Sequence, residues 1–235
     1  MTRNRGFQHT HPQSEFVAFL DSDDTWEPGA LALLVDALER HPEHGAAHGL
    51  ARSTELEGRQ YESDDLTDSM RQRRAIQGGR FVDLPISAPT TFEAVLVKNY
   101  LVTPGTSLIR RRLFESLGGY EPATVPCDDW DMNLRIARNG GFFFADRVIL
   151  NWRRHPDAIS NTSRRWRQSY LAVRKRAIRS ADNTPTQRQA ARFAFISECR
   201  GIRGEALEDL KRGEVRSAGR ALARALLFHL AYYCS

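Results

Sequence analysis

Apolar and polar residues follow one another along the first part of the chain in an order that predicts a strand and then a helix. Residues 16–20 form a continuous apolar run, which predicts a strand buried on both faces. The run ends in the acidic segment 21–24, and Pro28 then opens a helical pattern that carries Leu31, Leu34, Val35 and Leu38. A strand, a short loop and a helix are half of a βαβ unit, and open α/β sheets bind ligands beyond the carboxyl ends of their strands. The acidic segment is therefore expected where a ligand would bind.

A polar interval separates this unit from the next predicted elements. Residues 52–80 are charged and nearly free of large aliphatic residues, so we predict a loop or irregular excursion. Apolar periodicity and turn residues then predict a helix near 90–99, a strand within 105–111, a short helix over 111–119, a helix over 127–141 and one or two strands within 142–156.

The pattern after about residue 163 is wholly helical. One apolar stripe consists of Trp166, Tyr170, Val173 and Ala177, and a second consists of Val215, Ala218, Leu222, Leu226, Leu230 and Tyr233. Residues 181–187 predict a break between helices, because they combine Asp, Asn, Thr and Pro. We expect the last stretch to pack on the core, with contact to a membrane surface or a partner as the alternative.

Composition and cysteine usage limit the class of protein. A chain of 235 residues, 41% hydrophobic and 27% charged, is long enough to bury a core and is typical of a soluble protein. No apolar run reaches the roughly 18 residues of a membrane span, and residues 1–13 lack the apolar stretch of a secretory signal. Cys127, Cys199 and Cys234 are odd in number and far apart, which disfavours a disulfide framework or a zinc site and fits a reducing cytosol.

The net charge of +5 comes from one segment. Residues 164–179 contain seven Arg or Lys and no acidic residue, and the rest of the chain has 27 basic against 29 acidic residues. We expect an amphipathic helix whose apolar stripe packs on the preceding domain and whose arginines face water. The alternative is a surface for phosphate backbones or acidic lipid headgroups, because Trp166 and Tyr170 interleave with the arginines.

The acidic segment 21–24 raises the question of what compensates its charge. Asp21, Asp23 and Asp24 follow a predicted buried strand directly, so we expect them to repel one another and to raise one another's pKa unless their charge is compensated. A hard divalent cation such as Mg²⁺ or Mn²⁺ supplies the compensation, with substrate phosphate oxygens as its other ligands. A solvated turn or helix cap is the alternative.

A second acidic group lies about a hundred residues further along. Asp128, Asp129 and Asp131 stand at the start of the predicted helix 127–141, where acidic residues cap free N–H groups and suit the helix dipole. One of them can also serve as a general base, because a helix start holds a carboxylate rigidly against a hydroxyl nucleophile.

Four motifs occur in an order that resembles the family 2 glycosyltransferases of GT-A fold. They are RNRG…EFVAFLDSDDTWEPGAL, TPGTSLIRRRLFESLGGYEP, CDDWDMNLRIARNGGFFF and WRRHPDAISN, and the resemblance covers about residues 3–161. It implies an α/β fold with a GT-A-like (Rossmann-like) mixed sheet flanked by helices. We accordingly expect a partial catalytic domain over residues 1–163 and a helical C-terminal extension over residues 164–235.

The resemblance implies a donor and metal side of the site. The family's Asp-x-Asp at the strand end holds a divalent metal, Mn²⁺ or Mg²⁺, on the diphosphate of a nucleotide sugar. Carried over, Asp23 is a metal ligand, Asp21 binds the ribose or the metal, and Asp24 supports them. The segment Arg153-Arg154-His155 resembles the basic segment that binds the diphosphate, with His155 as a further metal ligand.

The resemblance also implies a catalytic and acceptor side. Asp129 corresponds to the catalytic base, and Asp128 and Trp130 lie on the acceptor side. The family's usual residue at the position of Asp128 is Glu, a mild departure. The implied reaction is inverting transfer from a nucleotide-diphosphate sugar to a hydroxyl of a saccharide, lipid-linked or other acceptor, in polysaccharide or glycoconjugate synthesis. We expect no nucleic-acid partner and a cytoplasmic location, with peripheral membrane contact through the C-terminal helices compatible with the pattern.

The family pattern has two elements upstream of the residues matched here. It begins with a strand of the VSVIIPTYN kind and a second strand that ends in Asp-Asp-Gly-Ser, whereas the match in this chain starts at Arg3-Asn4. We therefore expect an N-terminally truncated fold that lacks about half of its nucleotide-binding sheet. Such a chain is expected to bind donor weakly and to turn over slowly or not at all.

Two other functions fit parts of the same sequence. FVAFLDSDDT also resembles the opening motif of haloacid-dehalogenase-type phosphatases, in which Asp21 would be the nucleophile, Asp23 the acid/base and Lys98 a phosphate ligand, with Mg²⁺ completed by Asp128 or Asp129. That motif does not account for the segments TWEPGAL or WRRHPDAISN. A non-catalytic interaction module that uses the basic helix 164–179 is the third possibility.

Overall fold

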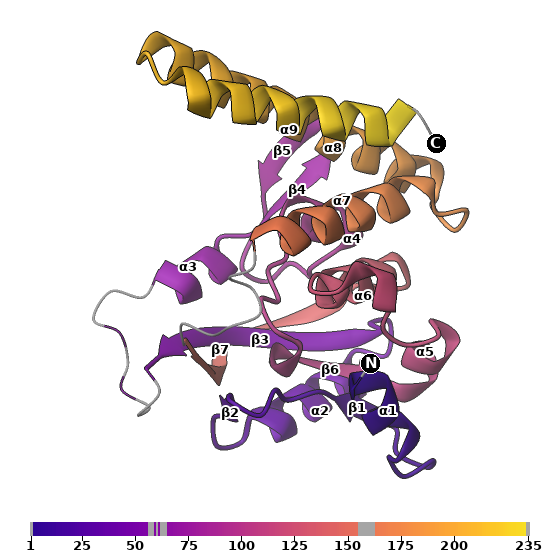
Figure 1. Cartoon of the computed structure of the whole chain (residues 1–235). Helices are drawn as coiled ribbons and strands as arrows, with labels where there is room; N and C mark the ends of the chain where they lie inside the picture. The colour runs from indigo at the N-terminus through magenta and orange to yellow at the C-terminus, as the bar shows by residue number, and fades with distance from the viewer. Residues whose placement is uncertain (1, 56–58, 60, 62–64, 155–162, 234–235) are drawn as a thin grey trace.

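The computed structural model describes residues 2–55, 59, 61, 65–154 and 163–233. A five-stranded mixed sheet runs through the first two thirds of the chain, in the order β1-β6-β3-β7-β2 (Figure 1). Its strands are β1 Phe16–Ala18, β2 Thr25–Trp26, β3 Ala46–Thr54, β6 Ser107–Arg110 and β7 Phe142–Arg153. The strands β3 and β7 are parallel, and the other pairs are antiparallel.

Helices cover both faces of this sheet. The helices of the sheet region are α1 Thr2–Gln8, α2 Ala30–Arg40, α3 Asp65–Arg71, α4 Phe92–Val97, α5 Arg111–Ser116 and α6 Asp128–Arg138, with 3₁₀ turns η1 Pro104–Thr106 and η2 Pro122–Thr124. Neighbouring strand residues face opposite layers, as the strand period of two requires. Ala46 and Ile109 lie in the core beneath α4 and α6, whereas Ala47 and Leu108 lie in the core against α2.

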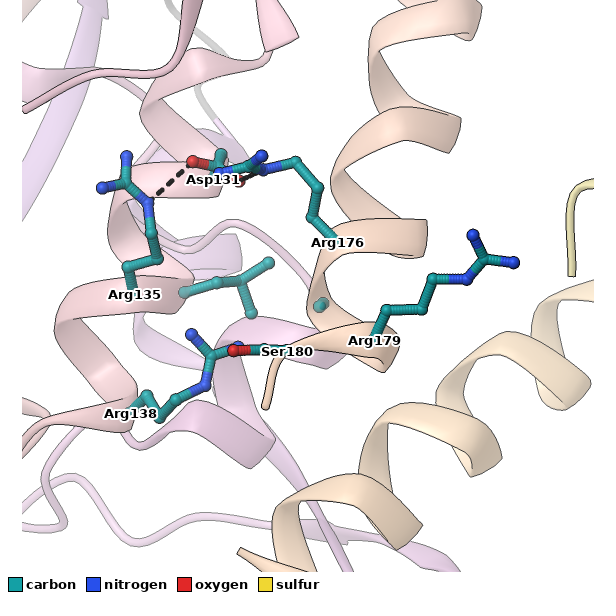
Figure 2. A pocket seen from close by; sticks show the side chains of 8 residues that line it. Asp131, Arg135, Arg138, Arg176, Arg179 and Ser180 are labelled. Atoms are coloured by element: carbon teal, nitrogen blue, oxygen red, sulfur yellow. Dashed lines mark hydrogen bonds and ion pairs between the residues drawn. The ribbon is translucent and has the colours of Figure 1, made fainter. Parts of the chain in front are cut away.

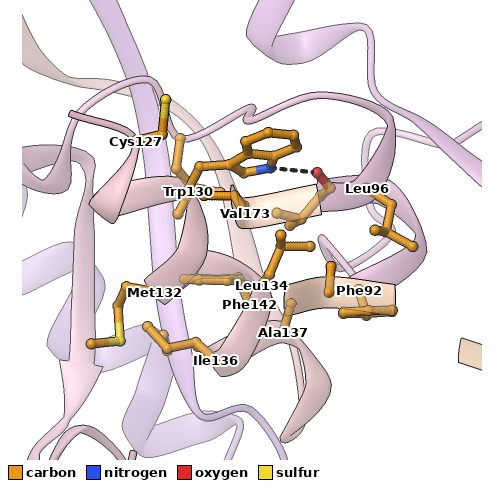
Figure 3. Packing of buried hydrophobic residues seen from close by; sticks show 14 of the residues in the cluster. Phe92, Leu96, Cys127, Trp130, Met132, Leu134, Ile136, Ala137, Phe142 and Val173 are labelled. Atoms are coloured by element: carbon orange, nitrogen blue, oxygen red, sulfur yellow. Dashed lines mark hydrogen bonds between the residues drawn. The ribbon is translucent and has the colours of Figure 1, made fainter. Parts of the chain in front are cut away.

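The larger core is built around α6. Figure 3 shows Trp130, Leu134 and Ala137 of this helix among side chains of α4, α7 and β7. The indole N–H of Trp130 donates to the carbonyl of Val95 over 2.9 Å, so its polar atom is satisfied inside the core. Burial of α6 on this side fixes where its acidic first turn lies, which is what positions the candidate site.

The C-terminal third consists of α7 Ser163–Arg179, α8 Pro185–Lys211 and α9 Val215–Tyr233. Thr184 and Gln187 form a capping box that starts α8, which accounts for the predicted break. In Figure 1, α8 and α9 lie side by side as a long pair above the sheet region. Val173 of α7 and Ala190 of α8 belong to the same core as α6, and the division at residue 163 stays a prediction. Among the described residues, the helices are all too short or too polar to cross a membrane.

The predicted element types are confirmed for most of the chain. The helices and strands expected between residues 90 and 153 are present as α4, β6, α5, α6 and β7, and helices follow from residue 163. The α/β class with a GT-A-like mixed sheet is therefore confirmed. Helix α1 was not predicted, because its seven residues show no apolar periodicity.

The prediction that the first strand is buried on both faces was wrong. β1 has three residues and lies at an edge of the sheet, and only Val17 is fully buried. In the described part of the chain β1 pairs with β6 alone, so Phe16 and Ala18 stay partly exposed and Leu20 is 41% exposed. An apolar run shows that a segment can be buried, but the neighbouring strands decide whether it is.

The predicted irregular excursion over residues 52–80 was also wrong for the parts of this range that the structure describes; residues 56–58, 60 and 62–64 lie outside them. The range contains the end of β3, helix α3 and a hairpin of β4 Arg74–Gln77 and β5 Arg80–Asp83. Gly78 and Gly79 make the two-residue turn with φ of 55° and 72°, which other residues rarely adopt. A Gly-Gly pair between two short apolar runs is a hairpin signal, and the polarity of the segment concealed it.

The predicted apolar stripe of α9 is only partly correct. Ala218 of that stripe is buried, together with Ala221 and Ala225, whereas Val215, Leu222 and Leu226 are 68%, 49% and 58% exposed. The side chains of Leu230 and Tyr233 lie outside the part of the chain that the structure describes. Small alanine side chains allow α9 to approach α8 closely, and this close packing selects the alanine face over the larger side chains.

Candidate functional site

Arg3 connects the two acidic groups that the sequence places about a hundred residues apart. Its Nη2 donates to both carboxylate oxygens of Asp21 over 2.8 and 3.0 Å, and its Nη1 donates to Oδ2 of Asp128 over 2.9 Å. The end of the β1 segment and the start of α6 therefore meet at one edge of the sheet, as the position of the acidic loop predicted.

Helix α1 holds Arg3 in this position. Asn4 donates from Nδ2 to the carbonyl of Tyr120 over 2.8 Å and accepts the N–H of Tyr120 over 2.9 Å. The rings of Phe7 and Phe114 lie 4.7 Å apart. Burial alone lowers the pKa of the Arg3 guanidinium, but the carboxylates of Asp21 and Asp128 more than offset this and raise it. Arg3 is therefore a fixed positive charge between two carboxylates.

Asp24 ties the acidic loop to the neighbouring elements. Its Oδ1 accepts the backbone N–H of Arg153 at the end of β7 over 3.1 Å, and its Oδ2 lies 3.4 Å from the hydroxyl of Thr103. The carboxyl is buried, and burial raises its pKa to about 6, with a further contribution from Asp23 and Asp21. Both oxygens thus have partners, which agrees with the supporting role implied for Asp24.

Asp129 has the environment of a proton acceptor. The Nδ2 group of Asn99 donates to its Oδ2 over 3.1 Å, and Asn133 in turn donates to Oδ1 of Asn99 over 2.9 Å. The side chain is half-buried, and burial together with the nearby Asp128 raises its pKa to about 6. This carboxyl is ionised at neutral pH and titrates close enough to it to take up a proton in a reaction.

Asp128 and Trp130 are less accessible than an acceptor side would require. Asp128 is buried and paired with Arg3, and burial raises its pKa while Arg3 opposes the rise. Trp130 is 4% exposed, and its ring lies 4.8 Å from the ring of Tyr170 and 4.8 Å from the guanidinium of Arg174. The structure gives Trp130 a core-packing role, so its acceptor-side role remains a prediction that the burial disfavours.

The basic segment at the end of β7 lies beside the acidic loop. Arg153 is half-buried and reaches Asp24 through its backbone N–H, and the backbone N–H of Arg154 donates to the carbonyl of Thr54 over 3.0 Å. The exposed guanidinium of Arg154 lies 5.2 Å from the ring of Trp152. His155 lies outside the described residues.

The donor set was compared with the needs of a divalent cation. The described residues contain no group of three His, Cys, Asp or Glu side chains arranged to hold a metal ion by themselves. Asp21 and Asp23 are carboxylates at the ligand edge, and they add to the effect of burial, the main cause, in raising the pKa of the neighbouring Asp24. This suits a hard cation that takes one or two carboxylates and completes its shell with phosphate oxygens and water.

Four polar residues of the site were not assigned from the sequence. In the sequence, Arg3 stood out only as the first residue of the motifs that resemble the family, and no sequence pattern pointed to Asn99, Thr103 or Asn133. The Arg-Asn pair at positions 3 and 4 was the available clue for Arg3. The amide contacts of Asn99 join the segment after α4 to α6 and depend on the packing of these elements.

Comparison with known proteins identifies the family and the fold of the chain. The model of "Glycosyl transferase family 2" matches residues 2–118. The chain carries a family 2 glycosyltransferase domain. Among solved structures, it is similar to S. aureus TarS 1–349 with a TM-score of 0.55 and 17% identity, over 98% of this chain and 59% of that chain. A second similar structure is TarS 1–349 in complex with UDP-GlcNAc, with a TM-score of 0.55 and 17% identity, over 97% of this chain and 66% of that chain.

The solved structures and the family match support different conclusions. At 17% identity the TarS structures show the fold alone, and this chain spans 59% and 66% of their lengths. A search of curated proteins finds no match. The family match includes the acidic loop, and it favours transferase over phosphatase chemistry. Lys98, which the phosphatase would use, is exposed and bonds to Ser69 of α3.

Proposed function

We propose that the chain supplies the general base, Asp129, for inverting transfer of a sugar from a nucleotide-diphosphate sugar to an acceptor hydroxyl. The observation that carries the proposal is the position of Asp129. Its carboxyl stands at the edge where Arg3 joins the acidic loop to α6, it is half-buried, and its pKa is raised to about 6. A base needs this combination of accessibility and raised basicity.

Asp129 accepts the proton of the acceptor hydroxyl while that oxygen attacks the anomeric carbon. The new C–O bond forms as the bond to the diphosphate breaks, and the electron pair leaves with the diphosphate. One displacement from the opposite face inverts the anomeric configuration. The amide N–H of Asn99 donates to Oδ2 of Asp129 and thereby orients the carboxylate for the acceptor.

The donor side is assigned to the acidic loop and the end of β7. Asp21 and Asp23 would hold Mg²⁺ or Mn²⁺, and the cation would offset the charge that develops on the diphosphate. Arg153 and Arg154 supply further positive charge at the same edge, and Asp24 fixes that edge through the Arg153 N–H. Arg3 keeps Asp21 oriented and balances Asp128.

The donor and acceptor are proposed by class. The TarS relative binds UDP-GlcNAc in its structure, which supports a nucleotide-sugar donor here. The acceptor is a hydroxyl of a saccharide, a lipid-linked or another molecule, and a cytoplasmic location with peripheral membrane contact stays a prediction.

The test is a transfer assay with a panel of nucleotide sugars and Mn²⁺, with release of nucleoside diphosphate as the readout. Asp129→Asn should lower turnover by about 10²-fold or more, whereas Asp83→Asn, on the exposed hairpin strand β5, should leave it unchanged. Donor binding, measured by calorimetry, should survive in Asp129→Asn. Equal turnover of Asp129→Asn and the parent chain would refute the role of Asp129. The phosphatase alternative would be favoured if the chain released inorganic phosphate from a phosphate ester and Asp21→Asn abolished that release.

A further inference from the structure

The paired helices α8 and α9 expose large apolar side chains along their length. The exposed residues of this kind are Ile196, Leu207 and Leu210 of α8 and Val215, Leu222 and Leu226 of α9. Figure 1 shows the pair above the sheet region, with the turn between the two helices at the end away from the sheet. Single exposed apolar residues are normal in a soluble protein, whereas a contiguous row of them marks an interaction surface.

The leucines of both helices lie on one side of the pair. Leu207 directly follows the buried Ala206, and Leu222 and Leu226 likewise follow buried alanines of α9. One residue turns a helix by about 100°, so each leucine lies about a quarter turn from the face that α8 and α9 share. The helices run antiparallel, since only the short turn 212–214 joins them. A quarter turn in the direction of each chain therefore places all three leucines on the same side.

This side of α8 is also basic. Arg203 is exposed and directly follows the buried Ile202, so it lies in line with Leu207. The exposed Arg192 stands in the same relation to the buried Ala191. Guanidinium groups and apolar side chains are therefore interspersed along one face.

The carboxylates of α8 lie on its other side. They are Glu198, Glu205, Glu208 and Asp209. Measured from the buried Ala206, all four lie about 60–160° round the helix in the sense opposite to Leu207. Oε2 of Glu198 lies 3.1 Å from Nε of Arg174 of α7, so this acidic side faces the rest of the molecule. The leucine side faces away from it.

Helix α9 adds positive charge without a carboxylate. Residues 215–233 contain no Asp or Glu, and Glu214 stands in the turn before them. Arg216 and Arg220 are exposed, about half a turn from the buried Ala218. Arginines of both helices thus border or interrupt the apolar face.

Helix α7 fixes the pair to the sheet region. Figure 2 shows Arg135 of α6 and Arg176 of α7 at the wall of a cavity, both directed at Asp131 of α6. Nε of each arginine donates to a different oxygen of this carboxylate over 2.8 Å. Nη1 of Arg174 donates to the carbonyl of Leu96 of α4 over 2.6 Å. A surface that docks on α8 and α9 is therefore connected through α7 to the helix that carries the proposed base.

We propose that this face of α8 and α9, with Leu207, Leu222 and Leu226 at its centre, docks on a membrane surface rich in anionic lipid. The apolar side chains enter the boundary between headgroups and acyl chains, and the arginines attract the anionic headgroups. A second copy of the chain fits this face less well, because it would bring the same positive charges together. The inference goes beyond the proposed transfer reaction and does not depend on it.

Cosedimentation of the full chain with lipid vesicles tests the proposal. The chain should bind vesicles of phosphatidylcholine and phosphatidylglycerol in equal parts more tightly than vesicles of phosphatidylcholine alone, and added salt should weaken the binding. The double variant Leu207→Gln with Leu222→Gln should weaken it by about tenfold or more, and Arg203→Gln by about fivefold. The matched controls Leu31→Gln of α2 and Arg112→Gln of α5 change exposed side chains outside this face and should bind as the parent chain does.

The remaining outcomes would overturn the proposal. They are absence of binding to the anionic vesicles, equal binding by the parent chain and the face variants, and equal binding to neutral and anionic vesicles. Circular dichroism checks the helix content of each variant, and Arg203→Gln carries the test if the leucine variant does not fold. Light scattering without vesicles examines the other occupant: a dimer that the leucine variant dissociates would assign the face to a second copy of the chain.

Discussion

Replacement of Asp129 by Asn should stabilise the fold at alkaline pH while it abolishes turnover. The raised pKa means that the folded protein holds a proton on this carboxyl more tightly than the unfolded chain does. The ionised carboxyl therefore costs folding free energy at pH values above its folded pKa of about 6, and this cost fades as pH falls towards the unfolded pKa.

The size of the effect follows from the same shift. A rise from 3.8 to about 6 is about two pKa units, or about 3 kcal/mol at about 1.4 kcal/mol per unit. The side chain is half-buried, so solvent screening reduces the expected cost to about 1–2 kcal/mol. Asn has one acceptor oxygen for the two donors that the carboxylate serves, the amide of Asn99 and the backbone N–H of Trp130, and the lost bond costs about 1 kcal/mol. The net gain is about 1 kcal/mol or less.

The difference in unfolding free energy between Asp129→Asn and the parent chain should change with pH, and this change tests the burial cost more directly than the difference at one pH. The lost hydrogen bond contributes equally at every pH and therefore does not affect the change. Relative to the parent chain, Asp129→Asn should gain about 1–2 kcal/mol of unfolding free energy between about pH 4 and about pH 8. Urea unfolding followed by tryptophan fluorescence measures it, with Asp83→Asn as the matched exposed control. If the stability difference between Asp129→Asn and the parent chain is the same at both pH values, the inferred burial cost is refuted.

Three other predictions use the same structure. Arg3→Met should lower the free energy of unfolding by about 2–3 kcal/mol, because it leaves Asp128 buried without its partner. Urea unfolding measures this loss. A loss below about 0.5 kcal/mol, the size of a surface effect, would contradict the prediction. Turnover should fall below about pH 6 as Asp129 takes up a proton, and a rate profile that stays flat to about pH 4.5 would argue against a base of that pKa. Gly49→Ala should destabilise the sheet by about 1–3 kcal/mol, because its Cβ would lie 2.8 Å from Cγ1 of Ile149, and an unchanged melting temperature would show that β3 and β7 can move apart.

The sequence by itself determined the elements with local signals. The apolar run before the acidic loop, the helix that begins at Asp128 and the capping box at Thr184 each depend on residues within a few positions of one another. Backbone geometry and side-chain period are set over such short distances, so the pattern predicted the strand, the helix and the break before Pro185, although not the capping box itself. The same reasoning located Asp129 and the acidic loop as candidate groups.

The tertiary structure alone decided how these groups meet. Arg3 lies 125 residues from Asp128 in the chain, and Asn99 contacts Asp129 only because α4 and α6 pack together. Ala218 and Leu222 belong to the same predicted apolar stripe of α9, and close approach to α8 buried the small side chains of Ala218, Ala221 and Ala225 and left Leu222 exposed. Local periodicity gives the faces of an element but not its neighbours, and burial, ion pairing and shifted pKa values arise from the neighbours.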